Sequence, residues 1–175
     1  MPSDINQQSV DNLITDLKYL QDEAEALKYV IDAVPYDQQT PSGTSVIERL
    51  MYIDHAQHKY YREVIEEAFK SPRPINLNQY HSPEDSFTPD PELSSDIQKV
   101  LFKLSKHRAA LLNIVEKIPV IDWEREIKGR KSDLTLYQFM EDMVREERKV
   151  FKEIADLVMS HQKDLEHQRE IRKGH

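Results

Sequence analysis

The chain has 175 residues, of which 32% are charged and 38% are hydrophobic, and its formal net charge at pH 7 is −8. This length suits one domain with a single core, and the composition is typical of helical bundles with charged outer faces. Lys and Arg are interleaved with Asp and Glu, which excludes a basic nucleic-acid-binding surface, and the lack of cysteine excludes disulfides and thiolate ligands.

The first predicted helix covers about residues 9–34, where apolar side chains recur at helical spacing. It ends at Pro35, because proline has no backbone N–H and clashes with the preceding turn of a helix. A second helix is expected to begin after Thr44 or Ser45, either of which can cap it, and to reach about residue 70.

The stretch that separates the second helix from the third reads SPRPINLNQYHSPEDSFTPDPEL and covers residues 71–93. It is rich in Pro and polar residues, so we expect neither a helix nor a strand in it. An ordered crossover would explain its length, and a flexible linker is the alternative. Its apolar side chains favour a loop that packs on the bundle: Ile75, Leu77, Tyr80 and Phe87.

The third predicted helix begins near Ser94 or Ser95 and closes at Pro119. A loop that contains Trp123 follows it. The fourth helix begins after residue 132 or 133 and continues to at least Val158, beyond which the apolar stripe is gradually lost.

Four amphipathic helices must bury their apolar stripes against one another. The sequence therefore predicts an all-α fold, namely a four-helix bundle with a long connection between helices 2 and 3. Residues 1–160 would form the bundle, and residues 161–175 a charged helical extension or a frayed tail. We expect a cytoplasmic protein with no membrane partner, because no apolar stretch could span a bilayer and MPSDINQQSV does not resemble a secretory signal.

Four polar residues fall on the apolar stripes, and burying them is costly unless they are paired. They are Gln57 on the second helix, His107 and Arg108 on the third, and Glu147 on the fourth. The more frequent arrangement is a polar network within the core, for instance with Arg108 paired to Glu147. The alternative is a network that lines a pocket and binds an anionic or polar ligand through Arg108.

The run DHAQH places Asp54, His55 and His58 close together in the sequence. However, His55 projects almost opposite the apolar stripe of its helix, and His58 lies well to one side. We therefore expect a solvated face, and the spacing of the histidines alone gives little support for a metal site.

Three stretches resemble the DinB/YfiT-like family of four-helix bundles. The start of the second helix, residues 43–57, reads GTSVIERLMYIDHAQ, and the Arg-containing part of the third, residues 106–115, reads KHRAALLNIV. The Trp-bearing loop and the fourth helix, residues 121–154, read IDWEREIKGRKSDLTLYQFMEDMVREERKVFKEI. The resemblance covers about residues 10–158, and it implies the same bundle that the apolar stripes predict.

The resemblance also implies where a metal site would lie. Members with a known activity hold a divalent metal, usually zinc or nickel, with one histidine from helix 2 and two from helix 4. In this sequence the first position falls on Tyr52 and the other two fall on Glu146 and Val150. Because all three are replaced, we expect a degenerate metal site and no bound cofactor. The alternative is a zinc or nickel site built from non-standard ligands.

Arg49 lies one turn before Tyr52, at a position that the family usually keeps apolar. It projects toward the side of the stripe that Glu146 occupies on its own helix. We therefore hypothesise that an Arg49–Glu146 ion pair, with Tyr52 nearby, fills the space of the metal. Simple drift of a once-functional site is the alternative explanation.

Because the ligand triad of the family is replaced, we expect a DinB-like protein that binds a small molecule or serves as a structural bundle. The alternative is a divalent-metal-dependent thiol S-transferase or hydrolase that uses non-standard ligands. The resemblance also implies a homodimer. We expect the candidate interface residues to be exposed, and they are Tyr60, Tyr61, Phe69 and the long connection. We expect no nucleic-acid partner.

Overall fold

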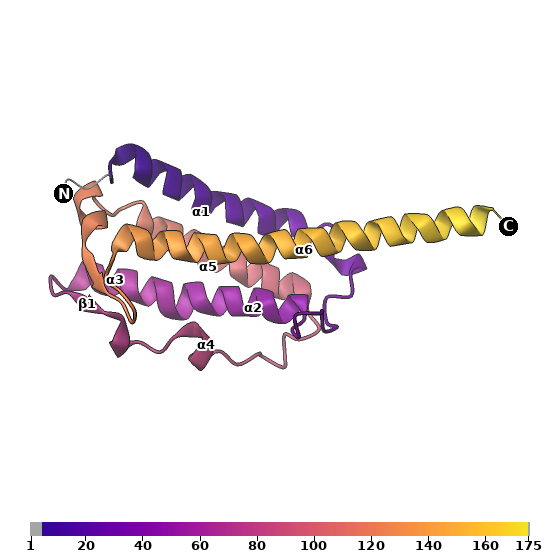
Figure 1. The fold of residues 1–175 in the computed structure, drawn as a ribbon, viewed down its shortest axis with the longest axis horizontal. Helices are drawn as coiled ribbons and strands as arrows, with labels where there is room; N and C mark the ends of the chain where they lie inside the picture. The colour runs from indigo at the N-terminus through magenta and orange to yellow at the C-terminus, as the bar shows by residue number, and fades with distance from the viewer. Residues whose placement is uncertain (1–4, 175) are drawn as a thin grey trace.

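The computed structural model describes residues 5–174, so residues 1–4 and 175, which the predicted bundle and tail include, lie outside the described residues. The chain folds into an all-α bundle of four long helical segments, which confirms the predicted fold class (Figure 1). The segments are α1 (Gln7–Leu27), α2 (Val46–Ala56) continued by η2 (Gln57–Tyr61) and α3 (Arg62–Lys70), α5 (Ile97–Val115), and α6 (Leu136–Lys173). Among the described residues, none of the helices is both long and apolar enough to cross a membrane.

The four segments enclose one apolar core. α1 and α2 each pack against both α5 and α6, so every predicted stripe faces the centre of the bundle. Each helix contributes side chains that are fully buried, such as Leu17, Leu50, Leu101 and Met140. Figure 1 shows that α2 and α6 run in opposite directions along the bundle, which decides which of their residues face each other.

Three helices begin or end at other residues than predicted. α5 starts at Ile97, with Asp96 as its cap in place of Ser94 or Ser95, and ends at Val115. α1 ends at Leu27, and a 3-10 turn, η1 (Ile31–Ala33), replaces the last part of the predicted first helix. Ile31 is still fully buried, so its place in the apolar pattern does not require an α-helix. α6 begins after Thr135, whose side chain accepts a hydrogen bond from the backbone N–H of Gln138 at 3.1 Å.

The connection between α3 and α5 is an ordered crossover, and the prediction that it contains no helix or strand is wrong. It carries β1 (Ile75–Asn76), a 3-10 turn η3 (Leu77–Gln79), and the single-turn helix α4 (Pro83–Ser86). Ser82 caps α4, and proline is well suited to a first helical position because its missing N–H would be unpaired there. α4 packs against α2, so the crossover lies along the bundle.

A small sheet joins the crossover to the loop before α6. β1 pairs in parallel with β2 (Glu126–Lys128), and β2 pairs antiparallel with β3 (Leu134–Thr135). A 3-10 turn, η4 (Val120–Glu124), precedes β2 and holds the fully buried Trp123. Two- and three-residue strands carry no readable alternation, which explains why the sequence pattern does not reveal them.

Arg125 fastens the start of the crossover to this loop. Its guanidinium donates hydrogen bonds to the backbone carbonyls of Ala68 and Ser71, and to that of Arg73 at 2.6 Å. Ala68 belongs to the last turn of α3, where helical carbonyls have no partner within the helix and carry partial negative charge. Arg125 therefore acts as a C-terminal cap supplied from a distant part of the chain.

The C-terminal part of α6 extends beyond the other helices (Figure 1). The last buried residue of α6 is Val158, and residues 162–174 are all exposed. This segment remains helical to Lys173, and its surface is mostly charged and polar.

Candidate functional site

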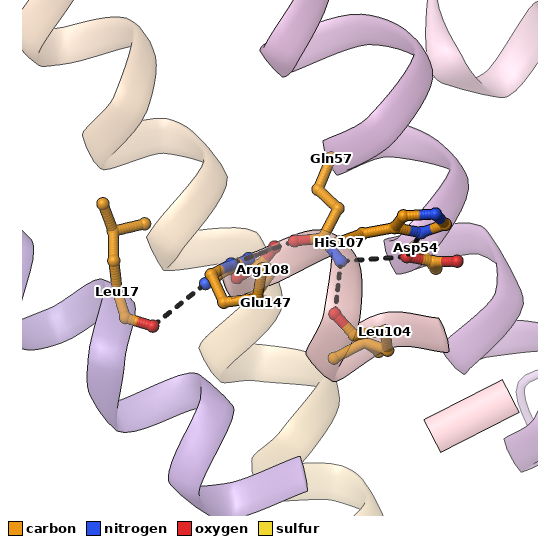
Figure 2. A network of polar contacts seen from close by, with 7 residues as sticks. All are labelled: Leu17, Asp54, Gln57, Leu104, His107, Arg108 and Glu147. Atoms are coloured by element: carbon orange, nitrogen blue, oxygen red, sulfur yellow. Dashed lines mark hydrogen bonds and ion pairs between the residues drawn. The ribbon is translucent and has the colours of Figure 1, made fainter. Parts of the chain in front are cut away.

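Arg108 is the centre of a polar network in the core. It is a charged residue, yet only 1% of it is exposed. Its Nε donates to Gln57 Oε1 at 2.9 Å, its Nη1 donates to the Leu17 carbonyl at 3.3 Å, and its Nη2 bonds to Glu147 Oε1 (Figure 2). The structure thus brings the predicted residues Gln57, Arg108 and Glu147 together in the core. Because the guanidinium is enclosed and each of its nitrogens donates to a partner within the core, Arg108 is not accessible to an anionic ligand in this arrangement.

The network continues from the core toward the surface through Asp54, which sequence reasoning did not assign to it. Gln57 Nε2 donates to Asp54 Oδ1 at 2.9 Å and to the Leu104 carbonyl at 3.0 Å. His107 Nδ1 lies 2.7 Å from the same Asp54 oxygen, so His107 reaches the network through Asp54 (Figure 2). The sequence signal that could have identified Asp54 is its i, i+3 spacing from Gln57, since side chains three residues apart on a helix are neighbours.

His55 and His58 do not lie on a solvated face, so that expectation is wrong. His58 is partly buried and stacks on His107, with ring centroids 4.0 Å apart. His55 Nε2 lies 2.8 Å from the Ser86 hydroxyl, and its ring is next to Phe87. The ordered crossover covers this side of α2, which the helical periodicity of the sequence could not show.

The burial of His58 predicts a stability that falls in acid. Burial lowers the pKa of His58, and the neighbouring His107 and Lys59 lower it further. The fold therefore favours the neutral ring: its contribution is complete above the unfolded pKa of about 6.5 and is lost as the pH falls through the folded value. We expect the melting temperature to drop less between about pH 7.5 and about pH 5.5 in His58→Gln than in the wild type.

Thermal melts followed by circular dichroism at the two pH values measure this difference. His167→Gln, on the exposed part of α6, is the matched control and should keep the acid sensitivity of the wild type. An acid-induced drop of equal size in His58→Gln and the wild type would contradict the prediction.

A cavity of about 300 Å³ lies between α2 and η2 on one side and α6 on the other. The N-terminal end of α4 and the side chain of Arg130 complete its walls. The crossover is thus part of the cavity, and it contributes Ser82, Pro83 and Glu84. We call this space the α2–α6 pocket.

Two residues that line the pocket, Tyr60 and Tyr61, come from η2, a π-helical turn within the second helical segment. A π-turn adds a residue to the helical repeat and is often found at functional sites. Tyr60 is 9% exposed and the adjacent Tyr61 is partly buried, and both line the α2–α6 pocket. The two tyrosines are therefore not exposed as predicted, whereas Phe69 is 50% exposed.

The three positions to which the family resemblance assigns metal ligands, Tyr52, Glu146 and Val150, all line the α2–α6 pocket. Burial, together with Glu84 and Glu146, raises the pKa of Tyr52 to about 12, so its hydroxyl stays protonated at neutral pH. Val150 has no donor atom. Among residues 5–174, no group of three or more His, Asp or Glu side chains is arranged to hold a metal ion. This set of donors does not fit a three-ligand metal site.

The hypothesised Arg49–Glu146 pair is wrong. Arg49 forms its ion pair with Glu153, and Glu146 lies 3.2 Å from Lys149 on its own helix. The reason is the antiparallel arrangement of α2 and α6: one turn back along α2 corresponds to a later residue of α6. The helical periodicity gave the side of each helix on which a residue lies, but not its position along the helix axis, so it could not identify Glu153 as the partner of Arg49.

Comparisons with known proteins support the fold. No protein-family model matches the chain, and no curated protein matches it in sequence. A solved structure that is similar is YfiT from Bacillus subtilis, described as a probable metal-dependent hydrolase with an unusual four-helix bundle topology. The two chains are 12% identical, the match covers 91% of this chain and 92% of YfiT, and the TM-score is 0.72. This likeness agrees with the fold implied by the family resemblance.

Proposed function

We propose that this chain is a small-molecule-binding bundle whose α2–α6 pocket lacks the metal site implied by the family resemblance. One observation carries the proposal: Tyr52, Glu146 and Val150 line a single pocket, yet only Glu146 among them has a carboxylate, Tyr52 keeps its hydroxyl proton and Val150 has no donor atom. A partly enclosed pocket with tyrosine rings, apolar side chains and a few charged groups is the usual form of a small-molecule site.

The second candidate function is that of a metal-dependent hydrolase or thiol S-transferase with non-standard ligands. The fold shared with YfiT favours it, because YfiT is described as a probable metal-dependent hydrolase. The carboxylates of Glu84, Glu146 and Glu147 in the pocket also favour it, since carboxylate oxygens bind divalent metals. In this case a metal would be bound as the protein is purified.

Restoring the three histidines distinguishes the two functions. We expect the triple variant Tyr52→His, Glu146→His, Val150→His to gain a zinc or nickel ion, whereas the wild type binds none. At a free metal concentration of about 100 Kd, binding stabilises a folded protein by about 2.7 kcal/mol. The measurements are the metal content of the purified proteins and their melting temperatures with and without a chelator.

The wild type serves as the control for the triple variant, because both keep the other carboxylates of the pocket. One equivalent of zinc or nickel in the wild type, with a fall in its melting temperature on chelation, would contradict our proposal and support the second candidate.

The proposal retains the homodimer implied by the resemblance. Because Tyr60 and Tyr61 face the pocket, the candidate interface is reduced to Phe69 and the exposed side of the crossover. We expect a dimer mass in light scattering at micromolar concentration, with Phe69→Asp shifting the protein toward the monomer. A wild-type chain that is monomeric in solution would contradict this part of the proposal.

A further inference from the structure

Glu147 lines the α2–α6 pocket, and one of its two carboxylate oxygens is buried without a hydrogen-bond partner among residues 5–174. The residue is 4% exposed, and Arg108 bonds to its Oε1. Within the part of the chain that the structure describes, Oε2 has no hydrogen-bond partner. A buried carboxylate oxygen that accepts no hydrogen bond is costly, so this atom calls for a donor. Glu147 lines the pocket, and the pocket is therefore where such a donor can approach.

The charged groups around the pocket favour a cation at Glu147. Three carboxylates line it, those of Glu84, Glu146 and Glu147, against one guanidinium, that of Arg130. Arg130 is already engaged, since its Nη2 donates to the Tyr80 carbonyl at 2.7 Å. Arg108 neutralises Glu147 from within the core but is itself enclosed. Glu146 also pairs with Lys149 of its own helix, so the charges of the wall largely balance. The preference for a cation therefore comes from the buried Glu147 Oε2, which can accept a hydrogen bond from an ammonium group and offers nothing to an anion.

The remaining walls favour an organic cation over a metal ion. Tyr52, Tyr60 and Tyr61 supply aromatic rings, and Met143 and Val150 supply apolar surface. A metal ion needs several ligands gathered at short distance, and the three carboxylates of the pocket do not form such a group in the part of the chain that the structure describes. An ammonium group needs a hydrogen-bond acceptor and gains from aromatic faces, while its hydrocarbon part packs on apolar side chains.

We propose that the α2–α6 pocket binds a small organic amine in its ammonium form, with an N–H group donating to Glu147 Oε2 and the apolar body packed among the tyrosines. This inference rests on the proposed function and names the class of its ligand. Glu147 is then a binding residue, and Arg108 positions it. The ligand enters from the side of Glu84 and Glu146, which are the exposed carboxylates of the pocket.

Calorimetric titration with three probes of nearly equal shape tests the inference: benzylamine, benzyl alcohol and benzoate at neutral pH. We expect benzylamine to bind at least tenfold more tightly than either of the other two. Glu147→Gln, which places an amide N–H₂ near the ligand nitrogen, should weaken benzylamine binding at least tenfold. Because this change also affects the partner of Arg108, its melting temperature is measured alongside.

A second variant does not touch the polar network. Val150→Phe fills the pocket from its apolar wall and should abolish benzylamine binding, whereas Ile121→Phe, at a position 76% exposed, is the matched control and should not. Equal or tighter binding of the alcohol or of benzoate would overturn the ammonium inference and leave the proposed function standing. Binding that survives Val150→Phe, or no binding of benzylamine, would also overturn the inference. Failure of the proposed function is seen separately, as stoichiometric metal in the wild type.

Discussion

Replacing Arg108 with methionine is expected to lower the free energy of unfolding by about 3–5 kcal/mol. The substitution leaves Glu147, which is 4% exposed, as a buried carboxylate without its counter-charge. It also removes the donors to Gln57 Oε1 and to the Leu17 carbonyl, both of which lie in the core. The lost interactions are therefore those of one side chain with three separate helices.

Urea denaturation of the wild type and of Arg108→Met measures this difference. Arg145→Met is the matched control, because the Arg145–Asp142 pair is exposed and such pairs contribute at most about 1 kcal/mol. The double variant Arg108→Met, Glu147→Met should recover much of the loss, since it removes the unpaired charge as well. A cost below about 1 kcal/mol for Arg108→Met alone would show that Glu147 is compensated by some other group.

The buried network illustrates how far the sequence could lead. Gln57, Arg108 and Glu147 each interrupt an apolar stripe, and the cost of unpaired burial made their association predictable. The same reasoning could not find Asp54, because Asp54 lies beside the stripe and does not interrupt it. Periodicity identifies which face a residue occupies, whereas partners between helices also depend on axial register, and this is why Arg49 meets Glu153.

The pocket was predictable only in part, for a different reason. The family resemblance placed Tyr52, Glu146 and Val150 near one another, and the structure has them lining one cavity. The π-turn that brings Tyr60 and Tyr61 inward leaves no mark in an apolar pattern, because one added residue is too short to distinguish from an ordinary helix. Glu84, which also lines the pocket, belongs to the crossover. The helices and strands of the crossover are too short to show a periodic apolar pattern in the sequence.

Because the crossover forms part of the pocket, the residue that fastens it should matter for both stability and binding. Arg125→Met is expected to lower the free energy of unfolding by about 2–4 kcal/mol, since hydrogen bonds from a charged donor contribute about 1.5–3 kcal/mol each and do not add fully. The carbonyls of Ala68 and Ser71 are partly buried and would lose this donor. The end of α3 would also lose the positive charge that offsets its dipole.

Hydrogen exchange can separate a local effect of Arg125→Met from a global one. We expect the amides of residues 71–86 to exchange faster in the variant, with a larger change than in α1 or α5, because the crossover opens before the bundle unfolds. Arg169→Met, on the exposed part of α6, is the matched control and should leave exchange in the crossover unchanged. Unaltered protection of residues 71–86 in Arg125→Met would mean that β1, through its pairing with β2, is sufficient to hold the crossover in place.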